Sequence, residues 1–196
     1  MQADRVEIVY RVKSRSCLYF EGFSEEIAAP IRVTSVTRVK CDGNVFVVPR
    51  IPGREIRRVV GVEDGNVVFS DLYPPCELLK RLLEARGVVE LGEFVELRYV
   101  SFVDRVAGLP VRCYVTVVKP DVVFEGLIII EEPCRKVGVV KRILDVLSAG
   151  ELIVGGLRLM GCGVISVDNI ALRVNGETIE GSVAVQEVLD KLCKSY

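Results

Sequence analysis

The strongest constraint on the fold is a period-two alternation near the start of the chain. Val6, Ile8, Tyr10 and Val12 are separated mostly by charged residues, the pattern of a strand with one buried face. Runs rich in β-branched and aromatic residues predict further strands at 33–40, 45–48, 94–103, 111–118, 124–131 and 164–174. The Asp42-Gly43 pair predicts a tight hairpin, because such turns need positive φ angles. The chain is therefore expected to build an antiparallel sheet.

Segments with apolar residues at helical spacing interrupt these strands. They lie at 54–60, 77–85, 137–147 and 182–192. Without its insertions, the order is strand, helix, strand, strand, helix, strand. This order predicts an α+β fold of the ferredoxin-like (RRM-like) βαββαβ type, an antiparallel sheet with helices on one face. We expect a single domain over residues 1–196, with hairpin insertions at about 31–48 and 101–118 and a C-terminal helix.

Composition suggests a cytoplasmic protein. Half of the 196 residues are apolar, yet no apolar run approaches the ~18–20 residues of a membrane span. The opening segment MQADRVEIVY lacks the apolar centre of a signal peptide. Scarce Asn and Gln, abundant Arg, Glu and Val, and the absence of Trp are typical of a thermophile. We expect no membrane partner.

The charged residues limit the chemistry. A net charge of −1 and a pI of about 5.7 fit a basic nucleic-acid binder poorly and suit a surface rich in ion pairs. However, 18 of the 26 cations are Arg, the side chain suited to phosphate contacts, and several cluster at 50–58. The chain has no histidine, which excludes His-based acid–base catalysis and His metal ligands.

The cysteines give no sign of a metal site. All seven, at positions 17, 41, 76, 113, 134, 162 and 193, lie outside any C-x-x-C motif, so we predict no metal and no cofactor. Buried free thiols are the default interpretation. A disulfide is also compatible with a hyperthermophile, and the sequence favours no particular pair.

A glycine-rich segment precedes the last predicted strand. Gly155, Gly156, Gly161 and Gly163 lie close together there. Glycine allows backbone N–H groups to approach a phosphate without a Cβ in the way. A turn followed by a bulge in the next strand explains the same residues equally well.

This segment resembles the C-terminal glycine-rich loop of the RAMP superfamily of CRISPR-associated proteins. The glycine spacing matches, and the resemblance implies that the loop contacts RNA. Leu157 and Met160 stand where the family often has Lys or Arg, and Cys162 stands where an aromatic residue is common. Only Arg158 remains as a side-chain cation, so the loop either holds RNA weakly or is mainly architectural.

Residues 48–57 resemble a second segment of that superfamily, in which Pro-Gly opens a helix that lies along the RNA. A helix N-terminus offers free N–H groups and a positive dipole end to a phosphate. The predicted RNA-binding residues here are Arg50, Gly53, Arg54, Arg57 and Arg58. The alternative is an exposed helix whose arginines pair with Glu55 and Glu63.

A third resemblance covers residues 102–108 and 118–126, which are similar to a hairpin and a strand entry of the backbone subunits of type III effectors. In that family the hairpin is a thumb that wedges into the guide–target duplex, and Asp104 and Arg105 would belong to it. A plain β-hairpin with Gly108 in its turn is the alternative. Taken together, the resemblances span about residues 48–167.

The same resemblance bears on catalysis. Target-cutting members carry an Asp in the loop after the first strand, where this chain has Ala28 and Ala29. Glu25 and Glu26 are nearby, but adjacent loop carboxylates are usually solvated. We therefore predict no catalytic residue.

The leading hypothesis is a non-catalytic, RNA-binding backbone-type subunit of a CRISPR effector. Its partners would be guide RNA, target RNA and sister subunits or copies of itself. One alternative is a RAMP endoribonuclease relying on Tyr10, Tyr19, Lys13 or the two glutamates. Another is a ferredoxin-like structural protein unrelated to nucleic acid, for which the acidic pI is the best argument.

Overall fold

The computed structural model describes residues 5–21, 31–32, 34–103, 108, 110–174 and 177–181. Its main sheet is antiparallel, with the order β11-β10-β1-β8-β5 and with β9 paired to β10. These strands are β1 (Arg5–Ser14), β5 (Val67–Phe69), β8 (Val123–Glu131), β9 (Glu151–Ile153), β10 (Val164–Val174) and β11 (Glu177–Glu180). The sequence pattern did not predict the three-residue strands β5 and β9.

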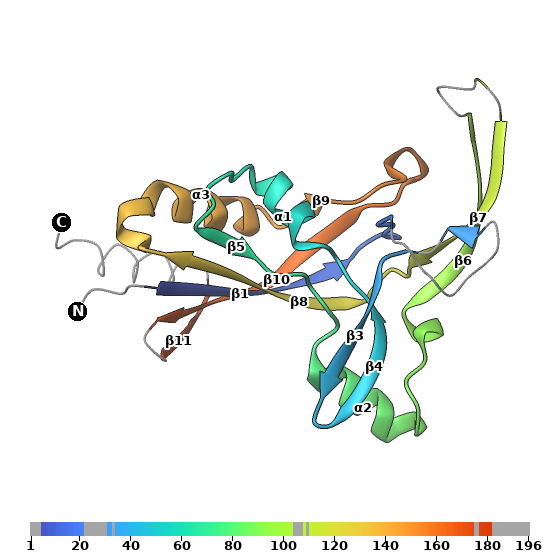
Figure 1. Ribbon diagram of the computed structural model, residues 1–196, viewed down its shortest axis with the longest axis horizontal. Helices are drawn as coiled ribbons and strands as arrows, with labels where there is room; N and C mark the ends of the chain where they lie inside the picture. Colours follow the sequence, from blue (N-terminus) through green and yellow to red (C-terminus); the bar gives the residue numbers. More distant parts are fainter. Residues whose placement is uncertain are drawn as a thin grey trace.

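Two helices cover one face of this sheet (Figure 1). They are α1 (Gly53–Val60) and α3 (Val137–Ser148), the second entered through the 3-10 turn η2 (Pro133–Lys136). Along the chain, these helices and the four longest-paired positions of the sheet follow in the order β1, α1, β5, β8, α3, β10. The predicted α+β class with an antiparallel sheet is confirmed.

The core lies between the helices and the sheet. The alternating residues of β1 that face the helices, Val6, Ile8, Tyr10 and Val12, are completely buried. The buried face of α3 joins the same core through Val140, Ile143, Leu144 and Leu147. Full burial of one such side chain stabilises a fold by roughly 1.5–3 kcal/mol. The period-two and helical patterns of the sequence therefore correspond to the two sides of one core.

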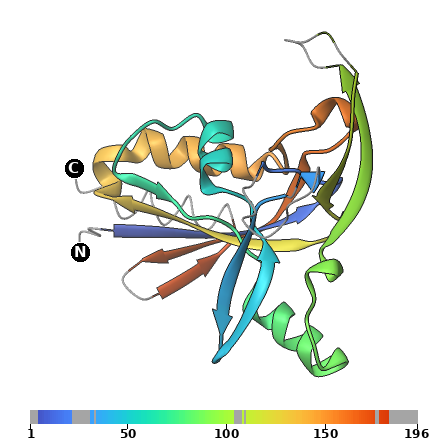
Figure 2. The ribbon, with the colours of Figure 1, turned by 45° about the vertical axis from the view of Figure 1, so that its right-hand side comes forward.

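A second sheet extends away from the main one (Figures 1 and 2). Its order is β2-β7-β6, formed by β2 (Ile31–Arg32), β6 (Val95–Val103) and β7 (Pro110–Val118), with the 3-10 turn η1 (Leu91–Glu93) before β6. β6 and β7 form the predicted antiparallel hairpin, and β2 pairs with β7 in parallel. Asp104 and Arg105 lie outside the described residues.

The third strand pair is the predicted hairpin of β3 (Val36–Cys41) and β4 (Asn44–Pro49). Asp42 and Gly43 both have positive φ, 46° and 85°, as the tight turn requires. The helix α2 (Cys76–Arg86) lies beside this hairpin, held by a Cys41–Cys76 disulfide and a Lys80–Asp42 ion pair. Figure 2 shows the hairpin and α2 together, below the main sheet.

The default interpretation of free thiols is wrong for four cysteines. Cys17 is bonded to Cys162, with 4.6 Å between their Cα atoms, and Cys41 is bonded to Cys76, at 5.8 Å. These pairs are 145 and 35 residues apart in sequence, so only the folded chain brings them together. Cys113 carries a free thiol.

A small second core surrounds the first of these disulfides. It joins Cys17, Tyr19 and Cys162 to Val100, Val115 and Val117 of the β6–β7 hairpin. The glycine-rich segment is thus attached to both the end of β1 and the second sheet. The predicted helix 182–192 and the loop with Glu25, Glu26, Ala28 and Ala29 lie outside the described residues. In the part of the chain that is described, no helix is long and apolar enough to cross a membrane.

Candidate nucleic-acid interface

The helix α1 begins where the sequence predicted, and its first residue must be glycine. A Cβ at Gly53 would lie 2.4 Å from the carbonyl oxygen of Phe69 and 2.5 Å from that of Ser70. Real Cβ atoms do not approach backbone oxygens so closely, so the absent side chain lets α1 start directly against β5. Pro52 precedes it in an extended conformation, which directs the chain into the helix.

Asp71 occupies the start of α1. Its Oδ1 accepts a hydrogen bond from the Gly53 N–H at 2.8 Å, and its Oδ2 accepts one from Arg50 Nη1 at 2.9 Å. The Arg50 Nε donates to Ser35 Oγ at 2.7 Å. One free helix N–H and one predicted RNA-binding arginine are therefore used within the protein. The sequence analysis missed Asp71, because nothing near it in sequence marks it as a helix cap.

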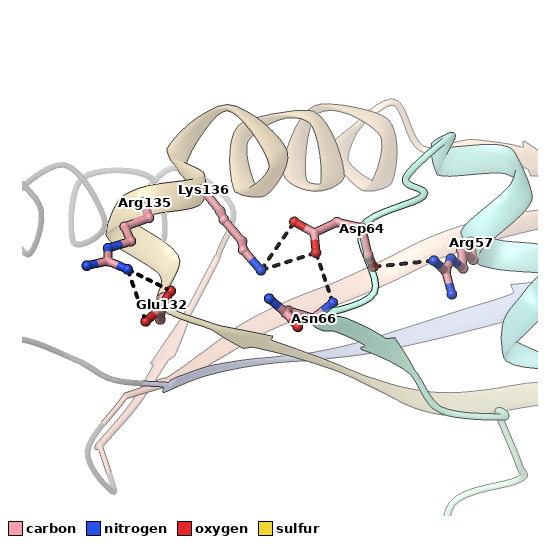
Figure 3. Close-up of polar contacts among 6 residues, drawn as sticks. All are labelled: Arg57, Asp64, Asn66, Glu132, Arg135 and Lys136. Carbon is pink, nitrogen blue, oxygen red and sulfur yellow. Dashed lines mark hydrogen bonds and ion pairs between the residues drawn. The ribbon is translucent and has the colours of Figure 1, made fainter.

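Arg57 points toward the chain that follows α1. Its Nε donates to the Val62 carbonyl at 2.9 Å and its Nη2 to the Asp64 carbonyl at 3.3 Å (Figure 3). The Asp64 carboxylate accepts from the Asn66 N–H at 2.9 Å and from Lys136 Nζ at 3.2 Å. The hydrogen bond from Asn66 and then the Lys136 ammonium hold the pKa of Asp64 below its ordinary value. Arg57 thus fastens the C-terminal end of α1 to the connection toward α3.

Arg54 and Arg58 project from the other side of α1, over a cavity of about 270 Å³. The walls of this cavity are α1, the glycine-rich segment and the chain after β1. Its lining consists of Tyr19, Phe20, Glu21, Pro52, Arg54, Glu55, Arg58, Gly155 and Gly156. Both arginines are exposed, and Arg58 is ion-paired with Glu55 at 2.6 Å. Of the cations predicted around α1, these two meet the glycine-rich segment.

The glycine-rich segment is irregular and lies between β9 and β10, with a short 3-10 turn, η3 (Arg158–Met160). Three of its glycines have positive φ: Gly155 at 74°, Gly161 at 77° and Gly163 at 109°. A Cβ at Gly155 would lie 2.5 Å from the Tyr19 oxygen, and one at Gly163 would lie 2.6 Å from the Val154 oxygen. Close backbone approach and backbone conformation together explain why glycine stands there.

All four glycine N–H groups donate within the protein. Gly155 donates to Glu55 Oε2 at 3.2 Å and Gly156 to the Tyr19 oxygen at 2.8 Å. Gly161 donates to the Arg158 oxygen at 3.0 Å, and Gly163 to the Cys17 oxygen at 2.7 Å. These contacts favour the architectural interpretation of the segment over a preformed cradle of open N–H groups.

The tip of the segment is apolar and exposed. Arg158 Nε donates to the Gly155 oxygen at 3.1 Å, which folds this predicted RNA-binding side chain back on its own turn. Leu159 is 95% exposed, and Met160 is exposed beside it. The arrangement differs from the cationic tip that the resemblance implies.

Two of the side chains considered for catalysis are unsuited to act as a base. Tyr10 is buried in the core, and burial raises the pKa of its hydroxyl. Lys13 forms an ion pair with Asp121 at 2.7 Å. Within the described ranges, no group of three or more Cys, Asp or Glu side chains is placed to hold a metal ion.

Comparison with solved structures identifies a related fold. No protein-family model matches the sequence, and no curated protein matches it either. The structure is similar to a chain in the cryo-EM structure of type III-B Cmr-beta bound to cognate target RNA, with a TM-score of 0.55 and 14% identity. The match covers 90% of this chain and 61% of that chain, so this chain spans less than two thirds of the matched one. The fold is of the kind found in CRISPR type III complexes.

Proposed function

We propose that this chain is an RNA-binding, non-catalytic backbone-type subunit of a CRISPR effector ribonucleoprotein. The observation that carries the proposal is that α1 and the glycine-rich segment meet around one cavity, with Arg54 and Arg58 exposed on it. Exposed arginines beside a groove suit contacts with a phosphate backbone. The similarity to a chain of an RNA-bound Cmr structure supports the same function.

We further assign the main sheet to the ferredoxin-like class, in its RAMP form. The support is the antiparallel order β10-β1-β8-β5, in which the first strand in sequence lies between the last and the third. The helices α1 and α3 follow the first and third of these strands along the chain. This is the connectivity of a βαββαβ unit.

The proposed partners are guide and target RNA, together with sister subunits or copies of this chain. Exposed apolar side chains on the second sheet support a protein partner, because monomeric proteins rarely leave such groups together. Leu97, Tyr99 and Tyr114 are each at least half exposed, and the two tyrosine rings are 5.4 Å apart.

The test is RNA binding by paired arginine variants. We expect Arg54→Ala/Arg58→Ala to weaken binding of a short labelled single-stranded RNA roughly tenfold and to lower the log–log salt slope by about 2, because each lost phosphate contact releases about one counterion fewer. Arg81→Ala/Arg173→Ala is the matched control. It removes two exposed cations that do not line this cavity. Fluorescence anisotropy across a salt series measures both quantities.

The other outcomes separate the competing functions. Equal weakening by both double variants would show non-specific attraction and remove the proposed surface. Failure of the parent protein to bind RNA would favour a structural protein unrelated to nucleic acid. Cleavage of the RNA in Mg²⁺ or Mn²⁺ would favour an endoribonuclease.

A further inference from the structure

Glu55 adopts an unusual position for a helix-surface glutamate. Its side chain is only 15% exposed, whereas its ion-pair partner Arg58 is 59% exposed. The carboxylate lies against the glycine-rich segment, and its Oε2 accepts the Gly155 N–H at 3.2 Å and Arg58 Nη2 at 2.6 Å. A residue 100 positions distant in sequence therefore supplies one of its two donors.

The groups that hold this carboxylate are those that hold a phosphate oxygen elsewhere in proteins. A glycine N–H in a left-handed turn and a guanidinium are typical donors to phosphate. Arg54 stands on the same cavity and is exposed, and no ion pair of it is found among the described residues. The cavity thus has the donors of an anion site, and a carboxylate of the chain itself occupies it.

We propose that Glu55 is an internal occupant of a phosphate site and that RNA must displace it to bind in this cavity. This inference rests on the proposed function. Since one carboxylate already satisfies Gly155 and Arg58, a single free phosphate gains little by replacing it. A continuous RNA backbone also engages Arg54 and neighbouring positions, so it can compete. Glu55 therefore selects a polyanion over isolated phosphate groups.

The displacement is physically accessible. Exposed ion pairs such as Arg58–Glu55 are weak in water and are screened by salt. A phosphate oxygen that replaces Glu55 takes over both hydrogen bonds, so neither the Gly155 N–H nor the guanidinium is left without an acceptor. The displaced carboxylate stays near the RNA and repels it. That repulsion lowers the affinity of the unmodified protein.

The decisive variant is Glu55→Gln. Its amide oxygen can still accept from Gly155, but its negative charge is gone. We expect roughly fourfold tighter binding of a short labelled single-stranded RNA, which corresponds to relief of one like-charge repulsion at about 5 Å in water. Inorganic phosphate, which does not compete with RNA on the parent, should compete on this variant. The matched control is Glu63→Gln, which removes one exposed charge just beyond α1 and should change neither result.

Unmodified protein provides a second measurement, independent of the variant's folding. In a ¹⁵N-labelled sample, the Gly155 amide signal should shift when RNA is added, because its acceptor changes from carboxylate to phosphate. An unmoved Gly155 signal, or equal RNA affinity of the Glu55→Gln and parent proteins, would overturn the inference. If the parent binds RNA through Arg54 and Arg58 all the same, only the inference fails. If neither protein binds RNA, the proposed function fails with it.

Discussion

The two walls of the cavity look alike in sequence and differ in the structure. Both the α1 segment and the glycine-rich segment combine glycines with arginines, and both suggested phosphate contacts. The α1 wall contributes charge, through Arg54 and Arg58. The glycine-rich wall contributes shape, because the N–H groups of its four glycines already donate within the protein. Glycine in a candidate binding loop can therefore serve backbone packing alone.

A similar division runs through the arginines around α1. Arg50 and Arg57 donate to fixed acceptors on the chain, at Asp71 and at the Val62 and Asp64 carbonyls. Arg54 and Arg58 are exposed at the cavity. The first pair holds the helix in place, and the second pair is presented by it. Spacing along the helix separates them, since residues 54 and 58 share a face and residue 57 does not.

The largest expected effect tests whether the glycine-rich wall is architectural. Gly163→Ala should reduce the free energy of unfolding by about 4 kcal/mol, because it combines a strained backbone with a clash against a backbone oxygen. The φ of Gly163 is 109°, and its Cβ would lie 2.6 Å from the Val154 oxygen. Urea unfolding followed by circular dichroism measures the change.

The matched control for this change is Gly161→Ala. Its φ is also positive, at 77°, but no atom lies within 4 Å of the added Cβ. Only backbone strain remains, which costs about 1 kcal/mol. Equal losses for the two variants would show that close packing does not explain the glycines of this wall.

The next effect concerns what fastens the glycine-rich wall to the rest of the protein. Cys17→Ala/Cys162→Ala should reduce the free energy of unfolding by about 3 kcal/mol, because the disulfide no longer constrains the unfolded chain. It should also weaken RNA binding, because the cavity loses the anchor of one wall. Denaturant unfolding and anisotropy measure the two effects.

Cys41→Ala/Cys76→Ala is the control for that pair. This disulfide joins the β3–β4 hairpin to α2, and none of the cavity-lining residues lies in those elements. We expect a loss of stability with unchanged RNA affinity. Loss of RNA affinity in this control, at a temperature where both proteins are folded, would show that the two regions are not independent.

The smallest effect tests the support behind the α1 wall. The pKa of Asp64 is lowered from 3.8 in the folded protein, so its ionised form stabilises the fold above that value. This contribution is lost as the pH falls below 3.8 toward the folded pKa. The thermal midpoint of the parent should therefore fall more steeply in acid than that of Asp64→Asn. Asp145→Asn, which removes an exposed charge on α3, should follow the parent, and parallel curves for all three proteins would contradict the assignment.

Much of the fold could be predicted from local pattern. The alternation in β1, the hairpin at Asp42-Gly43, the start of α1 and the apolar stripe of α3 all appear where the sequence placed them. The strands β5 and β9 did not, because three residues are too few for a periodic signal. Each exists because a longer strand beside it supplies its hydrogen bonds: β8 for β5 and β10 for β9.

The sequence by itself determined which segments become strands and helices and which loops need glycine. These properties depend on side-chain spacing and on backbone conformation, which act over a few residues. Only the tertiary structure decided which donors remain available to a ligand. Asp71 reaches the start of α1, Cys17 bonds to Cys162, and Glu55 reaches Gly155. Such pairings are set by packing between segments far apart in the chain, and no local pattern encodes them.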